Sequence, residues 1–402
     1  MFKLATPLIN VFLALFLLFQ LIYFNINYWI TADAPVYLSY ARDISEGQIL
    51  YKNLICSYTP LVIYINSIFF SFFEFNYQYF IIFQYLIIFL SSYFLFRLAI
   101  NLGKCINESV FITLLFLLTV FCCDGTAFIL EPYLLLFSFC SILCIYKEKY
   151  FLSGIFIALS FLSKQYGLIY FPVFLILLYY EKKLNVKSFI NYSLGFLIPQ
   201  IFFLLFIVFY TGVSAESLIS QLLGKQYDFD SSTFEVGLLQ YLLGGKVLIS
   251  LMLIYFFSIK IKRDYYLLFI MLFLTLIPTF IKTYQHYFLI AFPIFFLIWL
   301  KGELKSLRLL NYLAIIFMIV INSFLLINRI NNYKHLKYVQ IKKSKEVLKK
   351  YPEGTDVIIE GYIYLYLMNN YKNPLIGKYG YQFSYKTISE AEKNKFKRLI
   401  IN

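Results

Sequence analysis

The sequence predicts an all-α polytopic membrane protein with a small α/β tail at its C-terminus. Of its 402 residues, 61% are hydrophobic and 22% aromatic, while only 14% are charged. The mean hydropathy of +0.75 exceeds what a soluble domain needs to fill its core, so most of the chain is expected to face lipid. The apolar residues form long runs between short polar segments, which is the pattern of successive membrane helices.

The first apolar run, residues 7–30, predicts a retained membrane helix, because it is longer than a signal-peptide core and no small-residue cleavage site follows it. The next stretch, Thr31 to Leu61, is where polar residues first gather. Apolar residues recur there at helical spacing, namely Val36, Tyr37, Tyr40, Ala41 and Ile44. Arg42, Asp43 and Glu46 take the other side, and Gly47 is expected to end the helix. This pattern predicts short amphipathic helices on the membrane surface.

Twelve apolar runs follow one another along the chain: 7–30, 60–75, 77–100, 109–123, 131–146, 151–162, 166–180, 188–211, 243–259, 265–281, 285–300 and 308–328. If 60–75 is a juxtamembrane or re-entrant piece, about eleven spans remain and the N-terminus lies inside. Every internal segment then carries a positive balance, whereas the external segments 31–58, 124–131 and 212–242 carry −1, −2 and −3. This agrees with the positive-inside rule, so we expect that topology, with the tail outside.

The two longest polar regions differ in character. The loop 212–242 predicts a short surface helix and then an irregular segment, which is typical of a lid beside a membrane site. The tail predicts the following elements: a basic helix over Lys334–Lys350, a turn at Pro352–Thr355, a strand at Asp356–Glu360, a helix at Tyr362–Asn370 and a last strand at Leu399–Asn402. We therefore expect a membrane domain over 1–331 and a small external α/β domain over 332–402.

Charge and cysteine content exclude several classes of function. The net charge is +14, and residues 329–402 hold 15 Lys and Arg against 6 Asp and Glu. Beside a bilayer, such a tail is expected to face anionic headgroups or an anionic substrate rather than nucleic acid. The six cysteines show no metal spacing with histidines, so disulfides and a Cys/His metal centre are not expected. No glycine-rich phosphate loop occurs, so no nucleotide site is expected.

The first polar stretch carries a resemblance to a known family. Its order of Asp33, Tyr37, Ala41, Gly47, Tyr51 and Pro60-Leu61 resembles the first external loop of GT-C glycosyltransferases, and most of all the protein-mannosyltransferase and aminoarabinose-transferase group. The resemblance implies that Asp33, the acid after the first helix, is the catalytic base. The alternative is that Asp33 only caps the next helix. Asp43 and Glu46 are lesser candidates that the helical pattern places on a solvated face.

A second acid of the family stands at the start of a helix after the second external loop, which maps to Glu131 in FILEPYLLL. The resemblance implies that Glu131 orients the acceptor or the base, or helps to hold a divalent metal as in some relatives. Asp124 competes for this role, and the Arg that usually precedes the acid is absent. The alternative is a plain helix-start signal made by Glu131 and Pro132.

Two further external clusters predict contacts to a lipid-linked phosphate. Lys164 and Gln165 stand in SFLSKQYG, which is similar to the family's Gly-rich helix end followed by Ser/Thr-Lys. An external Lys runs against the positive-inside rule, so Lys164 is expected to have a partner; the alternative is snorkelling. His286 and Tyr287, in TYQHYFLIAFP, resemble the family's Arg/His-Tyr-Leu segment and are expected to donate to phosphate or sugar; the alternative is a plain hydrogen-bonded histidine.

The end of the first loop departs from the family. Many relatives have a Lys before Pro-Pro-Leu that contacts phosphate, whereas this chain reads Ser57-Tyr58-Thr59-Pro60-Leu61. Tyr58 can donate a hydrogen bond but brings no charge. We therefore expect Lys52 or Lys164 to supply the missing cation.

Together these features predict an inverting glycosyltransferase of GT-C type in a bacterial plasma membrane. It would move a sugar from a polyprenyl-phosphate donor to a lipid, glycan or protein acceptor at the external (periplasmic) face. No cofactor is certain; the resemblance allows a divalent metal, as in some relatives, but the sequence shows no clear ligand cluster for one. One alternative is an envelope polysaccharide polymerase or ligase, which usually needs several Arg in a large external loop; 212–242 has none. Another is a transporter or flippase, which would need charged or broken helices at mid-membrane.

Overall fold

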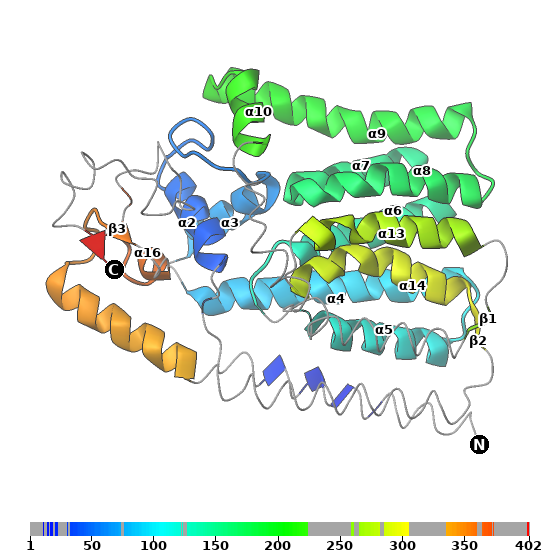
Figure 1. Ribbon diagram of the computed structural model, residues 1–402, viewed down its shortest axis with the longest axis horizontal. Helices are drawn as coiled ribbons and strands as arrows, with labels where there is room; N and C mark the ends of the chain where they lie inside the picture. Colours follow the sequence, from blue (N-terminus) through cyan, green and yellow to red (C-terminus); the bar gives the residue numbers. More distant parts are fainter. Residues whose placement is uncertain are drawn as a thin grey trace. The chain divides into compact units, whose positions relative to one another are not determined.

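The computed structural model describes most of the chain (Figure 1). The described residues are 33–73, 76–121, 127–223, 265–281, 285–304, 335–359 and 364–371, with shorter pieces at 11, 14–15, 17–18, 21–22, 30, 123, 259–260, 373 and 400–401. They are mostly helical and their strands are short, so the helical fold class is confirmed at this level.

The chain forms two compact units from interleaved segments. The first comprises Met1–Ile26, Ile82–Ile201 and Phe229–Arg329. The second comprises Asn27–Ile81, Phe202–Asp228 and Ile330–Asn402. Residues 330–402 therefore belong to the same unit as the first polar stretch.

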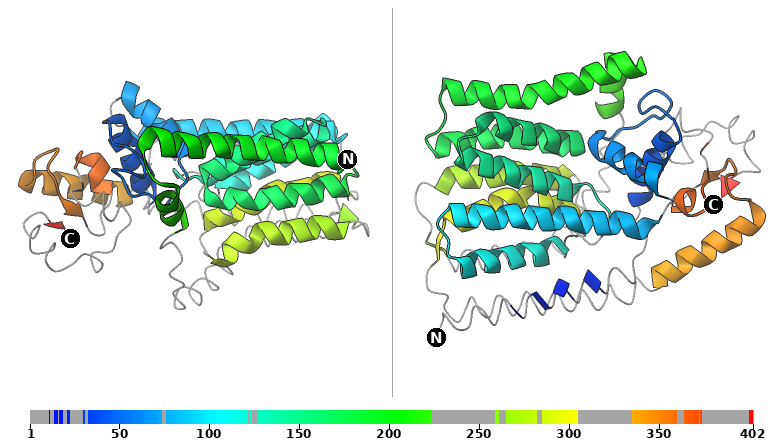
Figure 2. Two further views of the ribbon diagram at one scale, coloured as in Figure 1. Left: turned by 90° about the horizontal axis from the view of Figure 1, so that it is seen from above. Right: turned by 180° about the vertical axis from the view of Figure 1, so that it is seen from behind.

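The first unit is a helix bundle. Its helices lie side by side in both orientations of the molecule (Figures 1 and 2). They are α4 (Tyr77–Asn101), α5 (Ile106–Val120), α6 (Glu131–Tyr146), α7 (Tyr150–Ser163), η2 (Gln165–Ile169), α8 (Tyr170–Tyr180), α9 (Val186–Leu205), α13 (Tyr266–Ile281), η5 (Gln285–Ala291) and α14 (Phe292–Lys301). Strands β1 (Ile259–Lys260) and β2 (Glu303–Leu304) pair antiparallel, with Ile259 opposite Leu304.

Helix α14 lies in the core of this unit. All residues of Phe292–Leu300 are buried, as expected for a helix that is apolar on every side. Phe296 meets Phe116 of α5 edge-on, with ring centroids 5.5 Å apart, and stacks on Trp299 at 6.3 Å. The bundle is therefore packed through its centre by aromatic side chains.

Helices α4 and α9 instead present apolar side chains outward. On α9 the exposed residues include Phe189, Ile190, Leu194, Leu197, Ile201 and Phe202, and on α4 they include Ile82, Leu86, Phe89 and Tyr93. Two described helices, Tyr77–Asn101 and Val186–Thr211, are long and apolar enough to cross a membrane. The other described apolar helices have 10–17 residues.

The expected spans can be compared with these helices only in part. Each apolar run between 60 and 211, and both runs between 265 and 300, forms helix. Helix α3 (Leu61–Phe72) has 12 residues, about 18 Å at 1.5 Å per residue, which is too short to cross a bilayer and fits a juxtamembrane piece. The run 308–328, and nearly all of 7–30 and 243–259, lie outside the described residues. The full count of eleven spans stays a prediction.

Two glycines let α7 and α9 cross at close range. A Cβ atom on Gly195 would lie 2.0 Å from the carbonyl oxygen of Phe151, and one on Gly154 would lie 2.1 Å from that of Tyr192. Backbones can approach this closely only where both helices lack a side chain, which is the small-residue packing found between membrane helices.

The second unit contains α2 (Ala34–Ser45), α3, the π-helical turn η3 (Phe206–Thr211) and α10 (Ala215–Leu223). Gly47, at φ +93°, ends α2 as expected, because this conformation favours glycine. The expected short helix in the 212–242 loop is confirmed by α10. Its Gln221 side chain donates to the carbonyl of Tyr51 (2.8 Å) and accepts from the amide of Cys56 (3.1 Å). The loop segment 224–242, expected to be irregular, lies outside the described residues.

The elements expected in the C-terminal tail are also found. Residues 335–350 are helical, Gly354 turns the chain at φ +76°, and β3 (Ile358–Ile359) pairs in parallel with β4 (Ile400–Ile401). Helix α16 (Tyr364–Met368) lies between these strands in sequence. The described part of the tail therefore contains helix and short strands in the expected order.

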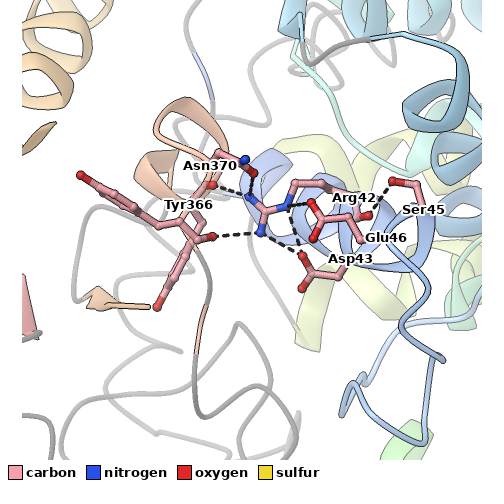
Figure 3. A network of polar contacts seen from close by, with 7 residues as sticks. Arg42, Asp43, Ser45, Glu46, Tyr366 and Asn370 are labelled. Atoms are coloured by element: carbon pink, nitrogen blue, oxygen red, sulfur yellow. Dashed lines mark hydrogen bonds and ion pairs between the residues drawn. The ribbon is translucent and has the colours of Figure 1, made fainter. Parts of the chain in front are cut away.

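Arg42 joins this tail to α2 (Figure 3). Its guanidinium donates to the carbonyl oxygens of Tyr366 (2.6 Å) and Tyr371 (3.0 Å) and to the side chain of Asn370 (3.3 Å). It also pairs with Asp43 at 2.9 Å. The expectation that Asp43 lies on a solvated face is wrong. Asp43 is only 7% exposed, because the tail covers this side of α2 and Arg42 neutralises the buried carboxylate.

Candidate functional site

Four of the predicted site residues meet in the first unit. Glu131 begins α6, Lys164 follows the last residue of α7, and His286 and Tyr287 belong to η5. All four are nearly covered, with exposed fractions of 1% for Glu131, 4% for Lys164, 8% for His286 and 6% for Tyr287. A buried group of acid, ammonium and imidazole is costly in a helix bundle, so its presence calls for a compensating interaction or a function.

The compensating interaction is an ion pair between Lys164 and Glu131. The Lys164 ammonium donates to Oε1 of Glu131. The same oxygen lies 3.7 Å from Nε2 of His286. The expectation that Lys164 has a partner is therefore confirmed, and the snorkelling alternative does not fit a side chain buried to this extent.

Aromatic rings close the cluster. The Lys164 ammonium lies 4.5 Å from the ring centre of Tyr287 and 5.8 Å from that of Tyr166. The two tyrosine rings meet edge-on at 5.2 Å, and the Tyr287 ring lies 4.8 Å from the imidazole of His286. Such ring faces stabilise a cation that has left water. Tyr166 and Tyr287 therefore supplement the single carboxylate that neutralises Lys164.

Local structure sets the position of each charged group. Lys164 has an extended backbone that ends α7, and η2 begins at the next residue, Gln165. A Cβ on Gly167 would lie 2.4 Å from the carbonyl carbon of Ser160, so only glycine lets the chain turn back this tightly. Glu131 stands at the N-terminus of α6 with Pro132 beside it. This is the favourable end of the helix dipole for a carboxylate.

Two polar residues that the sequence analysis did not select hold these segments together. Gln84, fully buried in α4, donates to the carbonyl of Ala127 and accepts from the amide of Ile129 at 3.1 Å, so it fixes the segment before Glu131. Tyr170 donates to the carbonyl of Ile290 at 2.6 Å and so joins α8 to η5. A signal for Gln84 was present, because it is a lone amide in the apolar run FIIFQYLIIF.

Glu131 keeps one oxygen that is not engaged. Within the described part of the chain, its Oε2 has no hydrogen-bond partner. Lys164 also has spare capacity, because Glu131 uses one of its three N–H donors. The cluster can therefore accept a proton donor such as a hydroxyl at Oε2 and donate to an anion from Lys164 and His286. The buried state shields both groups from bulk water.

Of the remaining predicted site residues, Gln165 begins η2 in the first unit, and Asp33, Tyr58 and Lys52 lie in the second unit. Asp33 precedes α2 and its backbone carbonyl accepts from the amide of Val36 at 3.1 Å, but its side chain makes no capping bond. Asp33 is half-buried, and its carboxylate has no hydrogen bond or ion pair among the residues that the structure describes. The capping alternative is therefore wrong, since a capping carboxylate would accept from an amide of the first turn.

Tyr58 and Lys52 belong to the loop between α2 and α3. Tyr58 is buried and meets Tyr37 edge-on at 4.7 Å, and Tyr37 lies one helical turn after Asp33. Tyr51 donates to the carbonyl of Tyr58 at 2.6 Å, which fixes the loop. Lys52 is exposed and makes no ion pair to the described residues. Its ammonium is thus available to an anion.

No metal centre is formed by the described residues, in which no three His, Cys, Asp or Glu side chains lie together. Asp124, the competing candidate for the role of Glu131, lies outside the described residues. No protein-family model, curated protein or solved structure matches this chain.

Proposed function

We propose that this protein is an integral membrane glycosyltransferase that transfers a sugar from a polyprenyl-phosphate donor to an envelope acceptor. The observation that carries the proposal is the buried cluster of Glu131, Lys164 and His286. These residues are far apart in sequence, and each was selected from a separate short motif of one enzyme family. Their assembly into one cluster would be an unlikely coincidence if the motifs were accidental.

The chemistry assigns a role to each group. Asp33 takes the proton of the acceptor hydroxyl while its oxygen attacks the anomeric carbon. The bond between that carbon and the phosphate oxygen breaks, and polyprenyl phosphate leaves with inversion. Lys164 and His286 stabilise the charge on the leaving phosphate. Glu131 holds Lys164 in place and offers Oε2 to a sugar hydroxyl. Tyr58, Lys52, Gln165 and Tyr287 contact donor or acceptor.

The membrane setting is supported by the outer faces of α4 and α9. A water-exposed surface with this many Phe, Leu and Ile side chains would aggregate, whereas lipid accommodates it. Polar clusters support the same setting, because they stand at opposite ends of α6. Glu131 begins this helix, and Tyr146 at its other end donates to Glu181 at 2.7 Å. The 16 residues between these ends span about 24 Å.

A transporter or flippase of lipid-linked saccharides is the second candidate. A buried pair such as Lys164–Glu131 is also typical of transport pathways. Its position favours the enzyme, since the pair stands where α6 begins and α7 ends rather than in the middle of a helix. The catalytic proposal also explains why Asp33, an acid without a partner among the described residues, stands at the start of α2.

The test is transfer of radiolabelled sugar from a panel of polyprenyl-phosphate sugars by membranes that contain Asp33→Asn, Lys164→Gln or Lys301→Gln. Lys301 is the control, because it also forms a close ion pair with a glutamate, Glu181, at 2.5 Å. We expect Asp33→Asn and Lys164→Gln to lower transfer by at least about 100-fold, the scale of one catalytic group. Lys301→Gln should retain transfer at equal expression.

Two results would contradict the proposal. Full transfer by well-expressed Asp33→Asn would show that Asp33 is not the catalytic base. Equal losses of transfer in the Lys164 and Lys301 variants would show that the Lys164–Glu131 ion pair supports folding and not catalysis. Export of labelled lipid-linked saccharide without any transfer product would favour the transporter.

A further inference from the structure

The helix formed by residues 335–350 has two opposite rows of side chains. Gln340, Ser344 and Val347 are buried, whereas Lys342, Lys345 and Lys349 are exposed. Lys342 and Lys349 each stand two positions after a buried residue and Lys345 two positions before one, and two positions on an α-helix correspond to about 200° of rotation. The lysine row therefore points away from the side by which the helix is attached to the rest of the second unit.

The buried row fixes the helix next to the end of an apolar run. The Gln340 side chain donates to the carbonyl of Ile30 at 2.8 Å and accepts from its amide at 3.1 Å. Ile30 is the last residue of the apolar run 7–30, and the helix begins seven residues after the apolar run 308–328. Seven residues reach at most about 25 Å. If these runs cross a bilayer, the helix is held close to the bilayer surface.

Apolar side chains accompany the lysines on the exposed side. Tyr338 is 65% exposed, Ile341 38% and Leu348 36%. Ile341 and Leu348 are seven residues apart, so they share one edge of the lysine row. A helix that binds only a soluble polyanion gains nothing from exposed Ile and Leu. An interfacial helix uses them to enter the headgroup region while its lysines meet lipid phosphates.

We propose that residues 335–350 are a peripheral lipid-binding helix whose Lys342, Lys345 and Lys349 contact the phosphates of anionic phospholipids. Ile341 and Leu348 insert between the headgroups beside them. This inference rests on the membrane setting of the proposed function and on none of its chemistry.

A chain of hydrogen bonds connects this helix to α2 in the first polar stretch. Ser344 donates to the side-chain oxygen of Asn369, and Asn369 donates back to the carbonyl of Ser344 at 3.3 Å. Asn369 is next to Asn370, which accepts from Arg42 of α2. Anionic lipid therefore stabilises the arrangement of α2, whose first turn follows Asp33.

The test is hydrogen–deuterium exchange of the full chain in nanodiscs of phosphatidylcholine, with or without phosphatidylglycerol. We expect peptides from 335–350 to exchange several-fold more slowly with phosphatidylglycerol, and α10 peptides to be unchanged. A triple variant should remove this difference in exchange; it carries Lys342→Gln, Lys345→Gln and Lys349→Gln. Each lysine is expected to contribute about five-fold to binding of the anionic lipid. A control variant loses the same net charge at three exposed lysines of the first unit, through Lys147→Gln, Lys149→Gln and Lys187→Gln. It should retain the slower exchange with phosphatidylglycerol.

A second variant separates lipid from a soluble polyanion. Ile341→Ser with Leu348→Ser keeps every charge and should weaken the phosphatidylglycerol effect. If this pair has no effect and soluble polyphosphate protects the helix equally in phosphatidylcholine discs, the lipid proposal is wrong. Wild-type protein that enters nanodiscs without lipid-dependent protection contradicts this inference alone. Protein that does not enter them contradicts the membrane setting of the proposed function as well.

Discussion

The Lys164 side chain is buried at the end of α7, and its ion pair with Glu131 compensates for the lost hydration. Two charges in a poorly hydrated site lose several kcal/mol of hydration, which close pairing and the rings of Tyr166 and Tyr287 offset. A buried pair of this kind is seldom the most stabilising choice, because apolar residues of equal volume would often serve better. The cost is consistent with a pair that is kept for chemistry.

The pair should show strong thermodynamic coupling. Glu131→Gln or Lys164→Met alone leaves one buried charge without its partner and should destabilise the protein by about 3–5 kcal/mol. The double variant should recover much of that loss, because no charge remains unpaired. Unfolding in detergent, followed by tryptophan fluorescence, measures all three proteins. Simple additivity of the two single losses would show that the residues do not interact.

The six cysteines offer a test of burial. Burial raises the pKa of the Cys56 thiol to about 12 from its ordinary 9.0, whereas Cys105 is exposed. The thiolate is the reactive form, so a three-unit rise alone slows alkylation roughly 1,000-fold near neutral pH. We expect a maleimide to modify Cys105 rapidly and Cys56 only after denaturation, as read by peptide mass spectrometry.

The same thiol carries a pH dependence with a definite sign. Because its pKa is raised in the folded state, the folded protein holds this proton more tightly than the unfolded chain does. Its contribution to stability is complete below pH 9 and is lost as the pH rises from about 9 to about 12. Rapid labelling of Cys56 at neutral pH without denaturant would contradict its burial beneath Gln221 and Tyr58.

Individual site residues could be selected from sequence, but not their pairing. The position of Lys164 on the external side indicated a partner without naming it. Asp43 was misjudged, because helical spacing shows which face a residue takes and not what covers that face. Its cover comes from residues more than 320 positions away in sequence, which no local pattern can reveal.

At the scale of elements, hydrophobic runs predicted the helices well. The run 131–146 matches α6 residue for residue, and 151–162 differs from α7 by one residue at each end. Such runs are long enough to separate helix from strand without ambiguity. Polar segments in the bundle were harder to interpret. The η2 and η5 turns depend on tertiary bonds such as Tyr170 to Ile290, which periodicity does not encode.

The crossing of α7 and α9 gives a prediction at this scale. Gly195→Ala places a methyl group against the carbonyl of Phe151, so the helices must separate. We expect a loss of about 1–3 kcal/mol, the usual cost of overpacking. Leu197→Ala, on the exposed face of the same helix, is the control and should cost less in detergent. Equal melting temperatures for Gly195→Ala and the wild type would rule out the close crossing.

At the scale of the whole molecule, the interleaving of the two units was not foreseen. A domain boundary near residue 331 was expected, because the composition of the chain changes there. Residues 330–402 instead share a compact unit with 27–81 and 202–228. Composition marks where solvent and lipid exposure change, but it carries no information about which distant segments pack together.

Substitution of Arg42 tests whether the C-terminal residues pack with α2 in one unit. Arg42→Met removes donors to two carbonyls and one amide, and leaves Asp43 buried without its cation. We expect a loss of about 3–5 kcal/mol, localised in the second unit. Hydrogen exchange in 364–371 should rise, whereas peptides of α6 and α14 should be unaffected. Glu216→Met, an exposed control on α10 of the same unit, should leave both regions as in the wild type.

The Arg42 contacts have a consequence for biosynthesis. Arg42 leaves the ribosome early, and its carbonyl partners at residues 366 and 371 are translated more than 320 codons later. The second unit therefore cannot be completed during translation; until the last segment arrives, Asp43 and its neighbours must remain hydrated or held by a chaperone. A premature stop codon between residues 330 and 366 should yield a chain whose helical bundle forms while α2 stays accessible to proteases.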